Sequence, residues 1–243
     1  MSDPFADAAH LEGVPSAIAA SRDGMDAMLR DRGLRQTTPE DTAHSLLIGA
    51  AATANLEGCE ITPDELAAGG GDVTARAALR MSTELLGLVP TWSAAPVQVL
   101  ARLHALAAAG SVDDADLGRP VDVQGTTRLT ELARMLSQPT EAPALVVAAL
   151  AHAEIASAQA FASHNEVIGR AVERLILVTR GVDPASVTVP EAGHAAEAKG
   201  YRSALAAYAS GETTGVHQWL LYAAQAFARA AEASPLAIRT PHG

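Results

Sequence analysis

The chain has 243 residues, of which 49% are hydrophobic but only 3% aromatic, and its formal charge is −11. This length fits one large domain with a helical extension, and the abundance of alanine and leucine favours helices over strands. The acidic balance argues against nucleic-acid binding, and no apolar run of the sequence is as long as a membrane span. Because Cys59 is the only cysteine, we expect a cytoplasmic protein without an intramolecular disulfide.

The N-terminal part reads as a series of helices with clear start signals. Residues 15–32 place apolar side chains at helical spacing, and Gly33 ends that helix. Residues 37–40 then combine a threonine cap, a proline and an acidic first turn, which predicts a second helix running to about Leu56. The pair Thr62 and Pro63 predicts another short helical turn in the same way.

The middle of the chain contains the one segment that does not read as a helix. Helices are expected over 72–88 and 96–109, after which residues 110–127 lose helical periodicity. A short alternating run at 121–123, flanked by glycine and proline, predicts a small β-hairpin or an extended flap. A short helix over 127–136 follows.

Two long helices form the expected centre of the domain. Residues 143–160 are nearly uncharged and apolar almost all round, as in a helix buried at the centre of a protein. The second central helix spans 166–180 and ends at Gly181. Closing helices over 199–209 and 214–233 supply the remaining apolar anchors.

The loop between the central helices carries the candidate functional residues. The order Phe161, Asn165, Gly169 and Arg170 resembles the Fic (Fido) domain, whose motif reads His-Pro-Phe-x-[Asp/Glu]-Gly-Asn-Gly-Arg-x-Gly-Arg. The resemblance covers roughly residues 42–233. It implies transfer of AMP from ATP to a hydroxyl side chain of a target protein, with Asn165, Gly169 and Arg170 as cofactor-binding residues.

The resemblance also implies an architecture. We expect a mostly α, single Fic/Fido-like domain over residues 37–233, with a small β-hairpin or flap. Residues 1–36 would form an N-terminal helical extension, and residues 234–243 a loose C-terminal tail.

A second motif lies upstream, at the end of the helix expected before Leu56. Thr53, Glu57 and Gly58 match [Ser/Thr]-x-x-x-Glu-[Gly/Asn], the inhibitory-helix motif of many Fic proteins. In that family the glutamate pairs with the second arginine of the catalytic motif. The resemblance therefore implies contact between Glu57 and Arg170.

The catalytic loop departs from the family pattern where the chemistry is done. Gln159 stands in place of the catalytic histidine, and an amide has no pKa suited to general-base catalysis. Ser163 replaces the carboxylate that holds Mg²⁺, although a hard cation prefers acidic ligands. His164 and Glu166 replace two glycines of the phosphate cradle, and Val167 replaces the first arginine. Glu166 puts a negative charge where a phosphate would bind.

Several of these residues also have an ordinary structural explanation. Arg170 and Glu57 would then be an ion pair retained for stability, and Asn165 the N-cap of the second central helix. Gln159 would hydrogen-bond the loop backbone, and His164 would be a solvent-exposed loop histidine.

The other histidines predict no metal site. His104 and His152 lie on apolar helices, as satisfied core histidines do. His44, His152, His164 and His194 show no close metal-ligand spacing.

We therefore favour a non-catalytic pseudoenzyme or binding protein of the Fic type, with no confident catalytic residue and no cofactor expected. The alternative is a transferase that uses a different phosphate-containing donor at the same loop, with His164 as base. Only that alternative calls for ATP or Mg²⁺. A third hypothesis, a generic helical interaction module, would require Glu57 to lie far from Arg170. A protein partner is expected, without nucleic acid or a membrane, and an alanine-rich helix face leaves a homodimer open.

Overall fold

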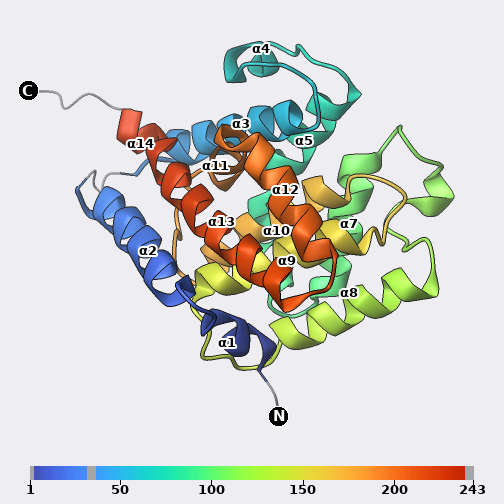
Figure 1. Ribbon diagram of the computed structural model, residues 1–243. Coiled ribbons are helices and arrows are strands. Elements are labelled where there is room, and N and C mark those ends of the chain that lie inside the picture. Colours follow the sequence, from blue (N-terminus) through green and yellow to red (C-terminus); the bar gives the residue numbers. More distant parts are fainter. Residues whose placement is uncertain (1–2, 32–36, 239–243) are drawn as a thin grey trace, which may run out of the picture.

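The computed structural model describes residues 3–31 and 37–238, and these residues form helices joined by short connections (Figure 1). The helices are α1 (Pro4–Ala9), α2 (Val14–Asp31), α3 (Pro39–Leu56), α4 (Pro63–Ala67), α5 (Val73–Leu85), α6 (Val89–Trp92), α7 (Pro96–Ala108), α8 (Val123–Leu136), α9 (Ala144–Ala158), α10 (Asn165–Thr179), α11 (Pro190–Ala196), α12 (Ala198–Ala209), α13 (Thr213–Glu232) and α14 (Pro235–Ile238), with 3-10 turns at Leu86–Leu88 and Asp114–Asp116. Within this part of the chain, no helix is both long and apolar enough to cross a membrane.

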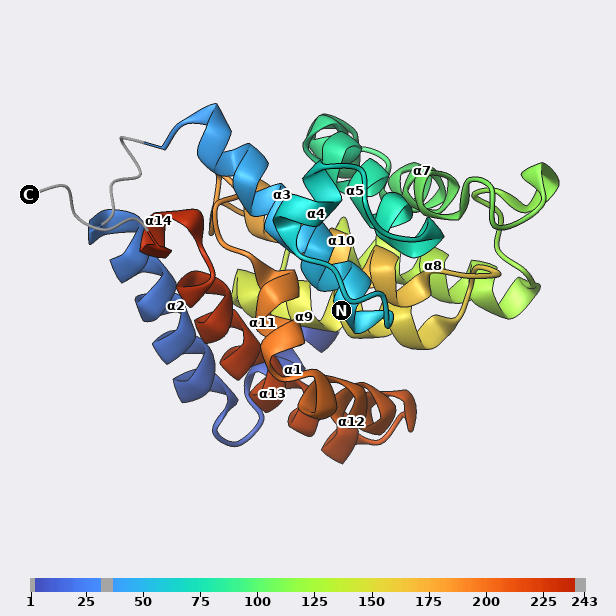
Figure 2. The same ribbon diagram turned by 90° about the horizontal axis from the view of Figure 1, so that it is seen from above.

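The two central helices lie where the sequence places them. α9 and α10 pack against each other in the interior, and α9 is buried nearly all round. α8, α12 and α13 contact α9, whereas α5, α6, α7 and α11 contact α10. Both views show this pair enclosed by the other helices (Figures 1 and 2). The loop between α9 and α10 is therefore anchored at both ends in the core.

The helix starts confirm the cap signals. Thr38 begins α3 through a reciprocal capping box with Asp41, and Thr62 begins α4 through the same arrangement with Glu65. In each case the threonine hydroxyl accepts the N–H of the third helical residue, and the acid accepts the N–H of the threonine. α3 therefore begins at Pro39, and its C-cap at the other end is Glu57.

The predicted β-hairpin or flap is wrong for the described residues. The only β-type contact there is an isolated bridge between Ala109 and Val112. α8 begins at Val123 instead of residue 127, because the Asp122 carboxylate accepts the Gly125 N–H (2.7 Å) as its N-cap. A three-residue alternation is too short to outweigh a helix cap. The segment before α8 still touches the loop between α9 and α10, residues 159–164, which we call the motif loop. The Val121 N–H donates to the Ala160 carbonyl (2.8 Å).

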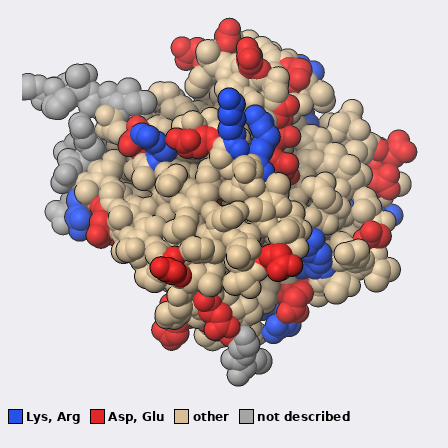
Figure 3. Space-filling model, viewed as in Figure 1, with Lys and Arg blue, Asp and Glu red and all other residues tan. Residues whose placement is uncertain are grey.

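The two ends of the described chain pack on different parts of the fold. Phe5, Val14, Ile18 and Met25 of α1 and α2 belong to the same hydrophobic core as α9, and α2 runs beside α13 (Figure 2). At the other end, Leu236 of α14 is buried in a small apolar cluster. Residues 239–243, the remainder of the expected tail, lie outside the described residues. The face in Figure 3 intersperses acidic and basic groups.

Candidate functional site

Two residues with left-handed backbone frame the loop between α9 and α10. Gln159 caps the C-terminus of α9 with φ 47°, and His164 precedes α10 with φ 61°. A side chain makes this region unfavourable, so each position costs about 1 kcal/mol or more. His164 stands where the resembling motif has glycine. The loop thus keeps a backbone shape that suits glycine, although the sequence no longer supplies it.

Asn165 serves the loop itself. Its amide donates to the Phe161 carbonyl (2.8 Å), and its Oδ1 accepts the Phe161 N–H (2.9 Å). The side chain is buried. The prediction that Asn165 caps α10 is wrong, because His164 occupies the N-cap without a side-chain bond and Asn165 is the first helical residue. The backbone of Phe161 satisfies both the oxygen and the nitrogen of this amide, whereas the helix end offers only N–H donors. The Asn165 side chain therefore bonds to the loop and not to the helix end.

The side chains at the expected catalytic positions bond to their neighbours. The Gln159 amide donates to the Ala156 carbonyl at the end of α9 (2.6 Å). Ser163 Oγ lies 2.7 Å from His164 Nδ1. His164 is half-buried, so the expectation of an exposed loop histidine is wrong. Burial lowers the pKa of its imidazole, with Glu57 acting in the opposite direction.

Gly169 sets the distance between the two central helices. A side-chain carbon there would lie 2.8 Å from both the ring and the carbonyl oxygen of His152. This spacing is too short for any real methyl group, so glycine lets α10 approach α9 closely. The structure therefore gives Gly169 a packing role beside the motif loop.

Arg170 is the most enclosed of the candidate residues. Its side chain is 0% exposed; Nη2 donates to Glu57, and Nη1 donates to the Tyr201 hydroxyl (3.0 Å). A second carboxylate, that of Glu166, lies 3.8 Å from Nη1. Burial opposes the charge, but the Tyr201 hydroxyl, Glu57 and Glu166 keep the pKa of the guanidinium above its usual value.

The upstream motif at the end of α3 places Glu57 beside Arg170. Glu57 is the C-cap residue of α3, and Gly58 follows it with φ 93°, which turns the chain away. Thr53, one turn earlier, is buried and accepts the Glu57 N–H through its carbonyl (3.2 Å). The hypothesis of a generic helical interaction module required Glu57 to lie far from Arg170. Their contact excludes that hypothesis.

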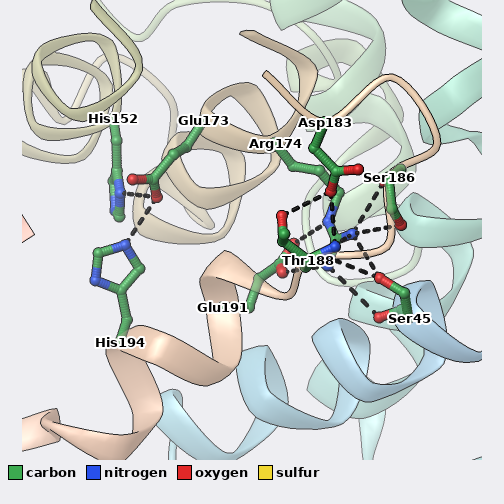
Figure 4. Close-up of polar contacts among 9 residues, drawn as sticks. All are labelled: Ser45, His152, Glu173, Arg174, Asp183, Ser186, Thr188, Glu191 and His194. Atoms are coloured by element: carbon green, nitrogen blue, oxygen red, sulfur yellow. Dashed lines mark hydrogen bonds and ion pairs between the residues drawn. The ribbon is translucent and has the colours of Figure 1, made fainter. Parts of the chain in front are cut away.

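Behind Arg170, a chain of buried polar groups crosses the core. Tyr201 OH lies 3.1 Å from His152 Nε2, and His152 Nδ1 lies 2.8 Å from Glu173 Oε2. His194 Nε2 reaches the same carboxylate oxygen, also at 2.8 Å (Figure 4). Burial lowers the pKa of His152 to about 4, against the pull of Glu173. Burial would raise the pKa of Glu173, but the two histidines outweigh it and bring that pKa to about 2.

His104 joins the motif loop to the segment before α8. Its ring stacks on Phe161 with centroids 4.5 Å apart, and its Nδ1 accepts the Gly118 N–H (2.9 Å). The predicted burial of His104 and His152 is confirmed, and both ring nitrogens of His152 have partners, but His104 Nε2 has none among the described residues.

Comparison with known proteins finds similarity at the level of structure only. No family model and no curated protein matches the sequence. A Fic family protein from Desulfovibrio desulfuricans superposes with a TM-score of 0.70 at 18% identity, covering 88% of this chain and 73% of that one. Fic-1 from C. elegans superposes with a TM-score of 0.66 at 12% identity, covering 89% and 71%. A variant of Fic-1 gives 0.62 at 14%, covering 88% and 70%.

The chain has the Fic fold. Beside the motif loop, this Fic fold has a pocket of about 350 Å³ between the end of α9 and α12. Its polar lining residues are Ser157, Gln159, Glu166 and Arg202. Arg170 is absent from its lining, so this pocket does not give a ligand access to the motif arginine.

The residues that sequence reasoning missed in this Fic fold are the buried partners of α10. Arg174 donates to both oxygens of Glu191 (2.9 and 2.6 Å) and to Ser45 Oγ (3.0 Å) (Figure 4). The available signal was Glu173 and Arg174 between the apolar pairs Ala171–Val172 and Leu175–Ile176 of α10. That signal indicates buried polarity without naming the partners.

Proposed function

We propose that this chain is a member of the Fic family that does not transfer AMP and acts by binding a protein partner. The observation that carries the proposal is the enclosure of Arg170, whose guanidinium is fully buried and bonded to Glu57 and Tyr201. In the AMP-transferring members that the chain resembles, this arginine serves a phosphate. Here Glu166 adds a second carboxylate 3.8 Å away, so a phosphate would meet two negative charges.

The remaining loop positions do not suit ATP and Mg²⁺. Gln159 cannot act as a base, and its amide is already used by the Ala156 carbonyl. Ser163 offers a neutral hydroxyl, which is a weaker ligand for Mg²⁺ than the carboxylate of the family motif. Loss of a general base alone typically costs about 10²–10⁴ in rate. We therefore derive no catalytic step through a nucleotide and assign the protein a binding role in a reducing, cytoplasmic setting.

Label transfer from ATP tests the proposal directly. Wild-type protein and Glu57→Gly would be incubated with ATP labelled on the α-phosphate, Mg²⁺ and a cell lysate. We expect no labelled protein in either case. Label on this chain or on a lysate protein, in either reaction, would sink the binding-protein proposal.

A gain-of-function variant tests the family assignment separately. It combines Glu57→Gly with Gln159→His, Ser163→Asp, His164→Gly, Glu166→Gly and Val167→Arg, which restores the motif except for the proline that Ala160 replaces. If the chain belongs to the Fic family, this variant should bind ATP and Mg²⁺ where the wild type does not. A correctly folded variant without nucleotide binding would count against the assignment.

The alternative function is a transferase with another phosphate-containing donor and His164 as base. One observation favours it: burial lowers the pKa of His164, which leaves the imidazole in its basic form at neutral pH. This alternative predicts a thermal shift with one member of a panel of nucleotides and sugar nucleotides, and loss of activity in His164→Ala. A panel without any shift would exclude it and leave the binding role standing.

A further inference from the structure

Three metal-ligand side chains from three helices meet in the core. They are His152 of α9, Glu173 of α10 and His194 of α11, and all three are buried. Their candidate ligand atoms lie within 4.8 Å of one another. Both imidazoles point at the same carboxylate, as Figure 4 shows. This cluster is joined to Arg170 through the Tyr201 hydroxyl, but the proposed function does not use it.

The charges around the cluster leave Glu173 without a cationic partner of its own. Arg170 is paired with Glu57, and Arg174 is paired with Glu191. Glu173 is fully buried, and its Oε1 has no hydrogen-bond partner. A buried carboxylate with one oxygen unpaired and no arginine or lysine beside it carries a large desolvation cost. A cation within the cluster would remove that cost.

The outer nitrogens of both imidazoles are already held. His152 Nε2 lies 3.1 Å from the Tyr201 hydroxyl, and His194 Nδ1 lies 2.9 Å from the Tyr222 hydroxyl. Metal-bound histidines are usually fixed in this way by a second group on the far nitrogen. A hydroxyl oxygen can accept as well as donate, so each ring can carry its proton outward and turn a lone pair toward Glu173.

We infer that His152 Nδ1, His194 Nε2 and both oxygens of Glu173 form a structural site for a divalent transition-metal ion, with zinc favoured by the donor set. Two histidines and a glutamate are an established combination for zinc. Four-coordinate zinc separates atoms of different ligands by about 3.3 Å. The nitrogen–oxygen pairs that are now 2.8 Å apart would spread by roughly half an ångström, and the two imidazole nitrogens, which lie within 4.8 Å of each other, would settle at the same spacing. Oε1, unpaired in the metal-free arrangement, would bind as the second oxygen of a bidentate carboxylate, whose narrow bite distorts the tetrahedron.

The burial of the site defines its role. All four ligand atoms are enclosed by helices, which leaves no open coordination position for a substrate. The ion would bind as α9, α10 and α11 assemble, and its binding energy would stabilise the fold. The spacing along the sequence predicted no metal site, because the ligands come from three separate helices and only the fold brings them together.

Metal analysis of the wild-type chain is the decisive experiment. The protein would be refolded with zinc chloride, passed through a desalting column and analysed by mass spectrometry for metals. We expect about one zinc ion per chain and a Tm higher by about 5 °C or more than after refolding with a strong chelator. Refolding with Co²⁺ instead should produce the visible absorption bands of tetrahedral cobalt, which requires no variant.

Variants identify the ligands. Glu173→Gln and His194→Gln should each lose the zinc, whereas His164→Gln, a half-buried histidine outside the cluster, should keep it. Wild-type protein with less than about 0.1 zinc per chain and an unchanged Tm would overturn the inference. Full zinc content in folded His194→Gln would also overturn it. In both cases the counter-charge of Glu173 would be a proton on one imidazole.

Discussion

Two arginines one turn apart on α10 are both buried, yet their surroundings differ. Arg174 is enclosed by Glu191, Ser45 and the backbone of the turn before α11, and the Glu191 side chain is only 6% exposed. Arg170 meets a glutamate at the end of α3 whose side chain is 28% exposed, and its Nε has no partner. All of these Arg174 partners are buried, and they link α10 to α3 and α11. The Arg170 contact has one partner within reach of water and can open.

Removing the Arg174 charge should have the largest effect on stability. Arg174→Met leaves the Glu191 carboxylate buried without a cation, which typically costs about 3–5 kcal/mol. The free energy of unfolding from urea titration measures this. Arg134→Met, which breaks an exposed pair with Glu131, is the matched control and should cost less than about 1 kcal/mol. Equal losses in the two variants would mean that enclosure does not distinguish Arg174.

Arg170→Met should cost less than Arg174→Met. The freed Glu57 can turn toward water, so the remaining loss is the hydrogen bond to Tyr201 and some packing, about 1–3 kcal/mol. The same urea titration decides this, with an unchanged slope as evidence that the fold is intact. If Arg170→Met lost as much free energy of unfolding as Arg174→Met, the contacts of the two arginines would contribute equally to stability.

Variants of Glu57 and Glu166 test which of these carboxylates keeps a nucleotide away from Arg170. Glu57→Gly alone leaves Glu166 3.8 Å from the guanidinium, so we expect no nucleotide binding by calorimetry. Glu57→Gly combined with Glu166→Gly should bind ATP weakly, with Kd in the millimolar range, about −4 kcal/mol. Glu60→Gly, at an exposed acid three residues from Glu57, is the control. Binding to Glu57→Gly as tight as to the double variant would remove Glu166 from the explanation.

The contrast between the two arginines also marks how far the sequence could predict the site. The partner of Arg170 is 113 residues away, but a motif names it, so this contact was within reach of sequence reasoning. Ser45 is 129 residues from Arg174, and no motif connects them. The contacts of Glu173 with His152 and His194 could not be predicted either, since they depend on how α9, α10 and α11 pack.

Local signals succeeded where one interaction dominates. The threonine caps at Thr38 and Thr62 were predictable because cap and proline act within one turn. At Asp122 and Asn165 two local interactions compete, and the sequence alone does not rank them. Asp122 caps a helix instead of sitting in a hairpin, and Asn165 braces the loop instead of capping α10.

The smallest expected effect concerns the histidine that holds the motif loop from behind. Burial lowers the pKa of His104, so the folded protein disfavours its protonated form. The unfolded chain therefore takes up the proton first as the pH falls below about 6.5, and stability decreases in that range. Protonation would also place a donor opposite the Gly118 N–H. His104→Gln keeps an acceptor there and does not titrate, so its unfolding free energy should fall less steeply from pH 7 to pH 5 than that of the wild type. Parallel profiles for the two proteins would mean that His104 keeps its ordinary pKa and that the loop is not held by a neutral imidazole.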